Sequence, residues 1–302
     1  MNSSTETGVS TQAQLVDLQL PSGGFAMLAV DQREALRVMI SEHQDAPVTD
    51  EQVQSFKLTA ARILTPFASA VLIDRQFALE AALDQQVVAD GCGLIASADH
   101  FESAHGELVG EVTIDHGIDP VALRKRGVVA LKLLVLYRPD GGAAERIAMT
   151  KEFIEICASA GLVSIIEPVS RKPLDGGPWD WNNGIVAAAE ELGSLGADLY
   201  KAEVPYHGEA SEADVRAACR RLSDVIDGPW VVLSSGVSEQ RFPQAVAWAC
   251  AEGALGFLAG RAVWASSIGA TELEVELRTN AVERLRKLRA VVDDAVDAHH
   301  FK

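Results

Sequence analysis

Gly256-Phe257-Leu258-Ala259-Gly260-Arg261 is the last of eight short apolar runs along this chain of 302 residues. Between the runs, apolar residues recur with helical spacing, so strand-like and helix-like segments alternate. Such alternation predicts a parallel sheet, and eight units in this length predict an α/β fold of the (β/α)8 TIM-barrel type. An open doubly wound sheet is the alternative, but it leaves the glycine–arginine turn after the eighth run without a role.

The segments divide the chain into one structured domain and a short tail. The tail, residues 1–14, is rich in Ser, Thr and Gln, and we expect it to be flexible; residues 15–302 contain no linker and are expected to form a single barrel domain. The expected strands span residues 24–31, 70–74, 93–98, 128–136, 162–169, 197–204, 230–237 and 256–260. The expected helices include residues 50–64, 143–160, 184–195, 209–225, 240–251 and a final charged helix at 272–298.

The composition argues against several classes of protein. A formal net charge of −17 disfavours a nucleic-acid surface or binding to an anionic membrane, since both need clustered lysines and arginines. Residues 1–14 lack an apolar core, so we expect no signal peptide there. The sequence also has no run of about 18 apolar residues, and we expect a cytoplasmic protein. The cysteines and histidines show no metal-ligand spacing, and we expect neither a metal nor a cofactor.

Three charged residues lie inside apolar runs, where a charge is costly unless it is paired. Lys201 is in the sixth run, Lys132 in the fourth and Glu167 in the fifth. Each one taken singly also fits a structural ion pair. Together, at the carboxyl ends of neighbouring barrel strands, they supply an amine nucleophile, a second cation and an acid/base carboxylate. This is the set of groups that a Schiff-base enzyme needs.

Other polar residues at strand ends predict a site for an anionic substrate. Glycines, hydroxyls and a guanidinium end the seventh and eighth runs, where barrels commonly bind phosphate; these residues are Ser234, Ser235, Gly236, Gly260 and Arg261. Further candidates for substrate binding are Asp31, Gln32 and Arg33 after the first run and Arg138 after the fourth. A second anionic group could be bound by Arg33, Arg75, Arg138 or Arg171, and the sequence does not choose among them.

Several of these segments resemble one family closely. They are GGFAMLAVDQREA at 23–35, LKLLVL at 131–136, GLVSIIEP at 161–168, GADLYK at 196–201, LSSGV at 233–237 and GFLAGRAVW at 256–264. Together they are similar to the class I aldolases of the tagatose-bisphosphate type, and within that family to the sulfofructosephosphate aldolases. The likeness runs from about residue 15 to near the C-terminus.

The resemblance implies a lyase that cleaves 6-deoxy-6-sulfofructose 1-phosphate into dihydroxyacetone phosphate and sulfolactaldehyde. It implies Lys201 as the Schiff-base lysine, Glu167 as the acid/base and Lys132 as its helper, with Arg261, Gly260 and Ser234 or Ser235 binding an anion. Aldolases of tagatose or fructose 1,6-bisphosphate, a transaldolase and a non-enzymatic sugar-phosphate sensor remain alternatives. The expected partner is a phosphorylated or sulfonated ketose, and by analogy the chain forms a homo-oligomer.

Overall fold

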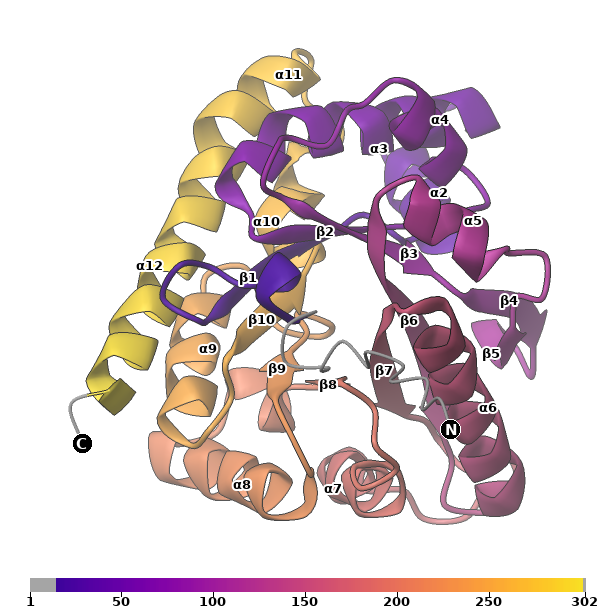
Figure 1. The fold of residues 1–302 in the computed structure, drawn as a ribbon, viewed down its shortest axis with the longest axis vertical. Coiled ribbons are helices and arrows are strands. Elements are labelled where there is room, and N and C mark those ends of the chain that lie inside the picture. Colours follow the sequence, from indigo (N-terminus) through magenta and orange to yellow (C-terminus); the bar gives the residue numbers. More distant parts are fainter. Residues whose placement is uncertain (1–14, 301–302) are drawn as a thin grey trace, which may run out of the picture.

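Eight parallel strands close into a barrel in the computed structural model, which describes residues 15–300 (Figure 1). The tail at residues 1–14, expected to be flexible, lies outside the described residues. All eight strands fall on the expected runs, so the predicted barrel is confirmed and the open sheet is excluded. In the order in which neighbours pair, they are β1 (Phe25–Ala29), β10 (Gly256–Ala259), β9 (Trp230–Val232), β8 (Leu199–Ala202), β7 (Val163–Ser170), β6 (Val128–Tyr137), β3 (Gly93–Ser97) and β2 (Ala70–Ile73).

Helices surround the strands as an outer layer (Figure 1). Two have the predicted bounds, α3 (Asp50–Leu64) and α6 (Ala143–Ala160). Thr49 caps α3, because its hydroxyl accepts from the Gln52 amide while the Gln52 side chain accepts from the Thr49 amide. The other helices are α2 (Glu34–Ser41), α4 (Leu79–Asp84), α5 (Pro120–Lys125), α7 (Trp181–Leu192), α8 (Glu212–Val225), α9 (Phe242–Ala251), α10 (Arg261–Trp264), α11 (Leu273–Glu276) and α12 (Val282–His300).

The final charged helix, expected at 272–298, is present as an unbroken helical segment. It consists of α11, a π-helical turn at Leu277–Ala281 that was not predicted, and α12. Leu277 and Ala281 of this turn are fully buried, so the wider turn keeps both apolar side chains on the face that packs against the barrel.

Inward and outward residues alternate along the strands with a period of two. In β1, Met27 and Ala29 face the barrel interior, whereas Leu28 packs in the layer between the strands and the helices. The same period brings charged residues into the barrel, each two positions after an apolar residue of the interior: Lys132 after Ala130, Glu167 after Ile165, and Lys201 after Leu199. The apolar interior therefore ends in a layer of charged side chains at the carboxyl ends of the strands.

An antiparallel hairpin follows β3 and was not predicted. Its strands are β4 (Asp99–Ala104) and β5 (Glu107–Ile114), joined by a two-residue turn at His105 and Gly106. Both turn residues have positive φ, 55° and 76°, which is the backbone that joins tightly paired antiparallel strands. The hairpin is largely polar and exposed, so it lacks the apolar run by which the barrel strands were recognised.

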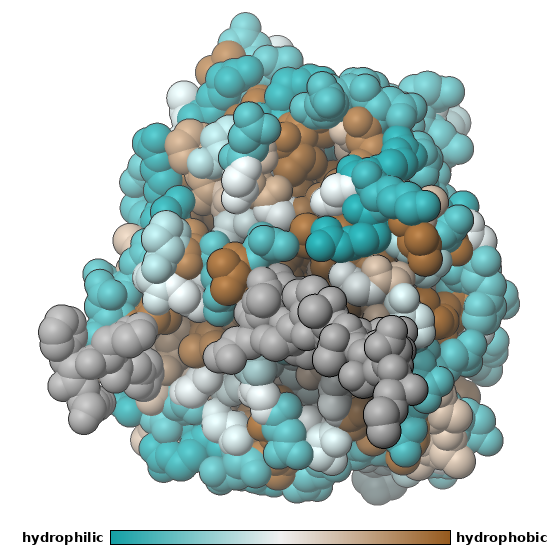
Figure 2. All heavy atoms as spheres, in the orientation of Figure 1, coloured by the Kyte–Doolittle hydropathy of each residue, from teal (hydrophilic) through white to brown (hydrophobic). Residues whose placement is uncertain are grey.

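The face of the molecule shown in Figure 2 is mostly polar. Hydrophilic residues cover the helical periphery, and hydrophobic ones gather toward the middle of the view in Figure 2. Within residues 15–300, no helix combines the length and the apolar character needed to span a membrane.

Candidate active site

A cavity of about 560 Å³ opens at the carboxyl ends of the strands. It brings together ten of the twelve residues predicted for the site, from six of the eight strands and the turns after them. These ten are Asp31, Gln32, Arg33, Lys132, Glu167, Lys201, Ser234, Ser235, Gly260 and Arg261. The hairpin supplies one wall of the cavity through Phe101, Ser103, Glu107, Leu108 and Val109.

A single carboxylate links the two lysines. Glu167 Oε1 lies 2.9 Å from Lys201 Nζ, and Glu167 Oε2 lies 3.0 Å from Lys132 Nζ. All three side chains are at least nine-tenths buried, so their ion pairs are shielded from water. The carboxylate can therefore exchange a proton with the amine of Lys201 while the second lysine balances its charge.

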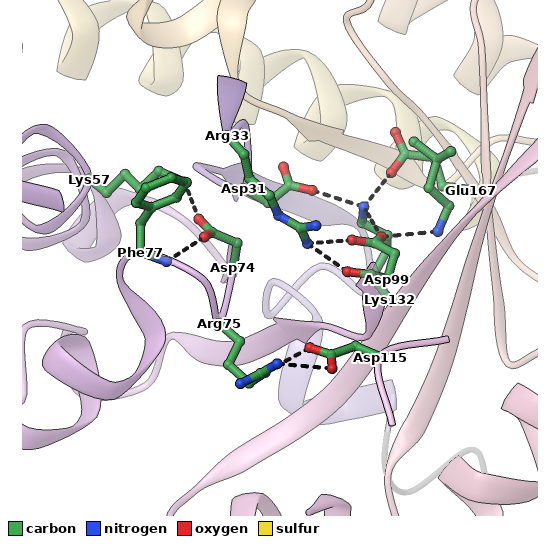
Figure 3. Close-up of polar contacts among 11 residues, drawn as sticks. Asp31, Arg33, Lys57, Asp74, Arg75, Phe77, Asp99, Asp115, Lys132 and Glu167 are labelled. Carbon is green, nitrogen blue, oxygen red and sulfur yellow. Dashed lines mark hydrogen bonds and ion pairs between the residues drawn. The ribbon is translucent and has the colours of Figure 1, made fainter. Parts of the chain in front are cut away.

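Lys132 is the most highly connected charge in the cavity (Figure 3). Besides Glu167, its ammonium contacts Asp31 Oδ2 at 2.9 Å and Asp99 Oδ2 at 2.8 Å. Burial alone would lower the pKa of Lys132, but the three carboxylates outweigh it and raise the pKa well above its ordinary value. Lys132 is therefore a permanent cation, and it is not the candidate nucleophile.

Asp31 stays ionised for a related reason. Burial would raise the pKa of Asp31, but the charges of Lys132 and Lys201 together hold this pKa well below its ordinary value. A fixed negative charge thus lies beside the lysine pair at the carboxyl end of β1.

Asp99 ends the third apolar run, a strand-end position from which polar residues are expected to face the pocket, although it is not among the residues predicted for catalysis or substrate binding. Its side chain is completely buried, and one oxygen contacts Lys132 and accepts from the Leu134 amide at 3.1 Å. Its other oxygen accepts from Arg33 Nη2 at 2.6 Å (Figure 3). Arg33 also stacks on Phe101, with its guanidinium carbon 4.1 Å from the ring centroid. The sequence thus indicates where Asp99 lies, but only the structure shows that it pairs with both Lys132 and Arg33.

A hydroxyl and a guanidinium meet on the opposite strands. Arg261 Nη2 donates to Ser235 Oγ at 2.6 Å, and buried Ser234 lies beside them. Gly260 is needed for packing, because a Cβ there would overlap the carbonyl oxygen of Ala29. Burial lowers the pKa of Arg261, but a guanidinium remains charged in proteins, so this end of the cavity can bind an anion.

Two predicted substrate-binding residues do not line the cavity. Gly236 is exposed, and its backbone lies against the ring of His207. Arg138 donates to Glu107 Oε2 at 2.9 Å and to the carbonyl oxygen of Lys172, which occupies its guanidinium. Their positions after the expected strands were correct, but the turn and the hairpin direct them away from the cavity.

The structure narrows the choice of arginines for a second anionic group. Arg75 pairs with Asp115 outside the cavity, with Nε and Oδ2 2.7 Å apart (Figure 3). Arg33 lines the cavity, but Asp99 already balances its charge. Arg171 lines the cavity with about a third of its side chain exposed. Of the four arginines named from the sequence, Arg171 is therefore the best placed.

Comparisons with known proteins find relatives among the aldolases. A tagatose 1,6-diphosphate aldolase 2 of Streptococcus pyogenes serotype M3 is 26% identical over 306 residues, covering 90% of this chain and 91% of its own. A tagatose 1,6-diphosphate aldolase of Listeria monocytogenes serotype 4a is 27% identical, covering 90% and 88%.

Solved structures show the same fold. An archaeal fructose 1,6-bisphosphate aldolase superposes with a TM-score of 0.63 at 16% identity, over 94% of this chain and 100% of its own. A fructose-bisphosphate aldolase of Slackia heliotrinireducens gives 0.63 at 16%, over 96% and 93%. The family model of the DeoC/LacD aldolases matches residues 25–266, which include all the barrel strands and the charged layer. This chain therefore belongs to the DeoC/LacD family of aldolases and is a lyase.

Proposed function

We propose that this aldolase works through a Schiff base on Lys201 and cleaves 6-deoxy-6-sulfofructose 1-phosphate into dihydroxyacetone phosphate and sulfolactaldehyde. The observation that carries the chemistry is the Lys201–Glu167–Lys132 chain, with contacts of 2.9 and 3.0 Å in a buried layer. It supplies an amine at the cavity floor, a carboxylate in contact with it, and a permanent cation behind the carboxylate.

In the proposed reaction, Lys201 transfers a proton to Glu167, and the neutral amine attacks the C2 ketone. Loss of water from the carbinolamine leaves a protonated imine, which accepts the electron pair of the breaking C3–C4 bond. Glu167, directly or through water, takes the proton of the C4 hydroxyl, and the aldehyde leaves. The remaining enamine is protonated at C3, and hydrolysis of the imine releases dihydroxyacetone phosphate and restores Lys201.

Two ends of the cavity match the two anionic ends of the substrate. The Arg261–Ser235 pair is suited to the C1 phosphate, because a guanidinium and a hydroxyl can both donate to its oxygens. The C6 group then points toward Arg171 on the β7 side. A sulfonate carries one charge spread over three oxygens, whereas a phosphate is largely dianionic at neutral pH. A single accessible guanidinium fits the monoanion better.

Trapping the imine tests the chemistry. Borohydride reduction in the presence of dihydroxyacetone phosphate should add mass to the peptide that contains Lys201, and Lys201→Met should show no adduct. Glu167→Gln should still form the adduct but cleave the ketose about 10²-fold more slowly or worse, the scale of general acid–base catalysis. An adduct on Lys132, or none in the wild-type protein, contradicts the proposal.

The second candidate is cleavage of tagatose or fructose 1,6-bisphosphate, which the names of the bacterial relatives favour. It uses the same charged layer and differs only in the group bound at C6. Comparing kcat/KM for the sulfonated ketose and for both bisphosphates separates the two. A protein that traps the ketose but releases its three-carbon unit only to an acceptor aldehyde is a transaldolase, and one that binds without trapping is a sensor.

A further inference from the structure

We infer that Glu107 makes the far end of the cavity selective for a singly charged group over a doubly charged one. The inference rests on the proposed function, since it takes that end as the place where the C6 group of the ketose binds. It assigns the discrimination to a carboxylate on the hairpin, in addition to the arginine that attracts the anion.

The hairpin places Glu107 at the cavity. Glu107 is the first residue of β5, directly after the tight turn at His105 and Gly106. The turn folds the strand back, so that Glu107, Leu108 and Val109 line the cavity opposite the layer of catalytic candidates. The Glu107 side chain is about 30% exposed, so its carboxylate is partly screened and still accessible from the cavity.

Glu107 contacts two guanidinium groups through the same oxygen. Its Oε2 lies 2.9 Å from Arg138 Nη2 and 3.5 Å from Arg171 Nε. Arg138 is almost completely buried and is also bonded to the Lys172 carbonyl, so it holds the carboxylate at the cavity edge. Arg171 reaches the cavity itself, and its Nη1 donates to the Ser170 carbonyl at 3.3 Å.

The charges of this group decide what it can bind. Two guanidiniums and one carboxylate leave one net positive charge (2 − 1 = 1). A monoanion such as a sulfonate neutralises that charge. A dianion leaves one unmatched negative charge and lies next to the carboxylate, and such like-charge contact is how sites reject a wrong partner. Arg33 cannot compensate, because Asp99 already neutralises it.

The test is Glu107→Gln, which keeps the size of the side chain and its capacity to accept a hydrogen bond but removes the charge. The kcat/KM ratio of fructose 1,6-bisphosphate to 6-deoxy-6-sulfofructose 1-phosphate should rise about tenfold, while kcat/KM for the sulfonate changes less. The matched control is Glu111→Gln on the same hairpin, where the carboxylate is exposed and contacts only His105 among the ion pairs of the described residues. Its ratio should stay that of the wild type.

The pH dependence of the substrate ratio is a second measurement. It shows whether Glu107 acts through its charge or only by holding Arg138 and Arg171 in place. The second ionisation of a phosphate ester has a pKa near 6. In the wild type, the ratio of bisphosphate to sulfonate should therefore rise as the pH falls through about 6, because the phosphate becomes a monoanion. The charged groups that face Glu107 are the guanidiniums of Arg138 and Arg171, which stay charged in proteins. Glu203 interacts with Arg171, and burial raises the pKa of Glu203 to about 7, so Glu203→Gln is the control and should keep the wild-type pH dependence of the ratio. Glu107→Gln should flatten this dependence.

The possible outcomes distinguish a failure of the role assigned to Glu107 from a failure of the proposed aldolase function. Melting temperatures show whether Glu107→Gln is folded, and Glu107→Ser serves as the second variant if it is not. An unchanged ratio and pH dependence in a folded, active variant overturns the role of Glu107 and leaves the aldolase chemistry standing. A wild-type protein that traps no ketose on Lys201 overturns the proposed function itself.

Discussion

Lys132 illustrates how a single residue organises this site. It is fully buried and contacts the carboxylates of Asp31, Asp99 and Glu167. Removing such a central charge leaves its partners buried and unpaired, which costs more than the pair itself contributes. We therefore regard Lys132 as the residue that allows three carboxylates and the amine of Lys201 to share one apolar barrel.

Glu203 is a buried carboxyl group beside this layer, and it predicts a pH dependence of stability. Its Oε2 accepts from the Ser170 amide at 2.7 Å, yet burial dominates and raises the pKa of Glu203 from 4.5 to about 7. Between these two values the folded protein binds more protons than the unfolded chain, so the free energy of unfolding falls as the pH rises from about 4.5 to 7. Above about pH 7, where Glu203 is ionised in the folded protein as well, the free energy of unfolding falls no further on its account.

Glu203→Gln should remove this dependence, since the amide keeps the acceptor for the Ser170 N–H and cannot ionise. As the pH rises from 4.5 to 8, the free energy of unfolding of the variant should increase by about 3 kcal/mol relative to that of the wild type, the size expected from such a pKa shift. Urea denaturation at pH 4.5 and pH 8 measures the difference. Exposed Glu152→Gln on α6 is the control, and an equal change in both variants would rule out burial as the cause.

At the scale of elements, ion pairs connect segments that the chain alone would keep apart. Lys57 of α3 pairs with Asp74 at the end of β2, and both side chains are fully buried (Figure 3). Burial lowers the pKa of Lys57 and raises that of Asp74, so this pair pins the helix to the strand at a cost in desolvation. Ion pairs join the hairpin to the barrel in the same way: Asp99 pairs with Lys132, and Glu107 pairs with Arg138.

The hairpin should therefore be a separable wall of the cavity. His100 and Thr113 are paired across it, so residues 101–112 can be replaced by an Asn-Gly turn without stretching the chain. Because β3 pairs directly with β6, the barrel should persist, with an unchanged circular dichroism spectrum. The loss of one cavity wall should raise KM for the ketose about tenfold and change kcat less, as expected for lost ground-state binding. A collapse of the barrel spectrum would show instead that the hairpin is needed for folding.

Closure of the whole molecule depends on the contact between its first and last strands. β1 pairs with β10 from Phe25–Gly256 to Leu28–Ala259, more than 200 residues apart in sequence. At Gly256 the backbone has φ +137°, and a Cβ there would overlap the carbonyl oxygen of Phe25. Only glycine allows β10 to approach β1 closely enough to complete the ring.

Gly256→Ala should destabilise the protein by about 3 kcal/mol or more, because the clash lies between two backbone segments that cannot move independently. Gly127→Ala is the matched control: its φ is also positive, +97°, but no atom lies within 4 Å of a Cβ there. Backbone strain alone should cost this control about 1 kcal/mol. If urea denaturation shows equal losses of stability in the two variants, backbone strain and not the close contact with Phe25 explains the need for glycine at position 256.

The barrel and the charged residues at its floor were predictable from the sequence, because both depend on local properties. Alternating periodicity identified all eight barrel strands, and the cost of burying a charge singled out Lys132, Glu167 and Lys201 within their apolar runs. The position of Arg261 after the last run likewise placed it at the cavity. Each of these inferences needs only the residues of one segment and the geometry common to barrels.

Only the tertiary structure decided which charges face the cavity and which are already paired. Asp99 directly follows the third apolar run and Glu107 lies on the polar hairpin. No local pattern reveals that Asp99 binds Lys132 or that Glu107 binds Arg138 and Arg171. The same contacts explain why Arg138, predicted to bind substrate, lies outside the cavity. Pairing between charges depends on distances between segments remote in the chain, and these distances exist only once the barrel has closed and the hairpin has folded across its mouth.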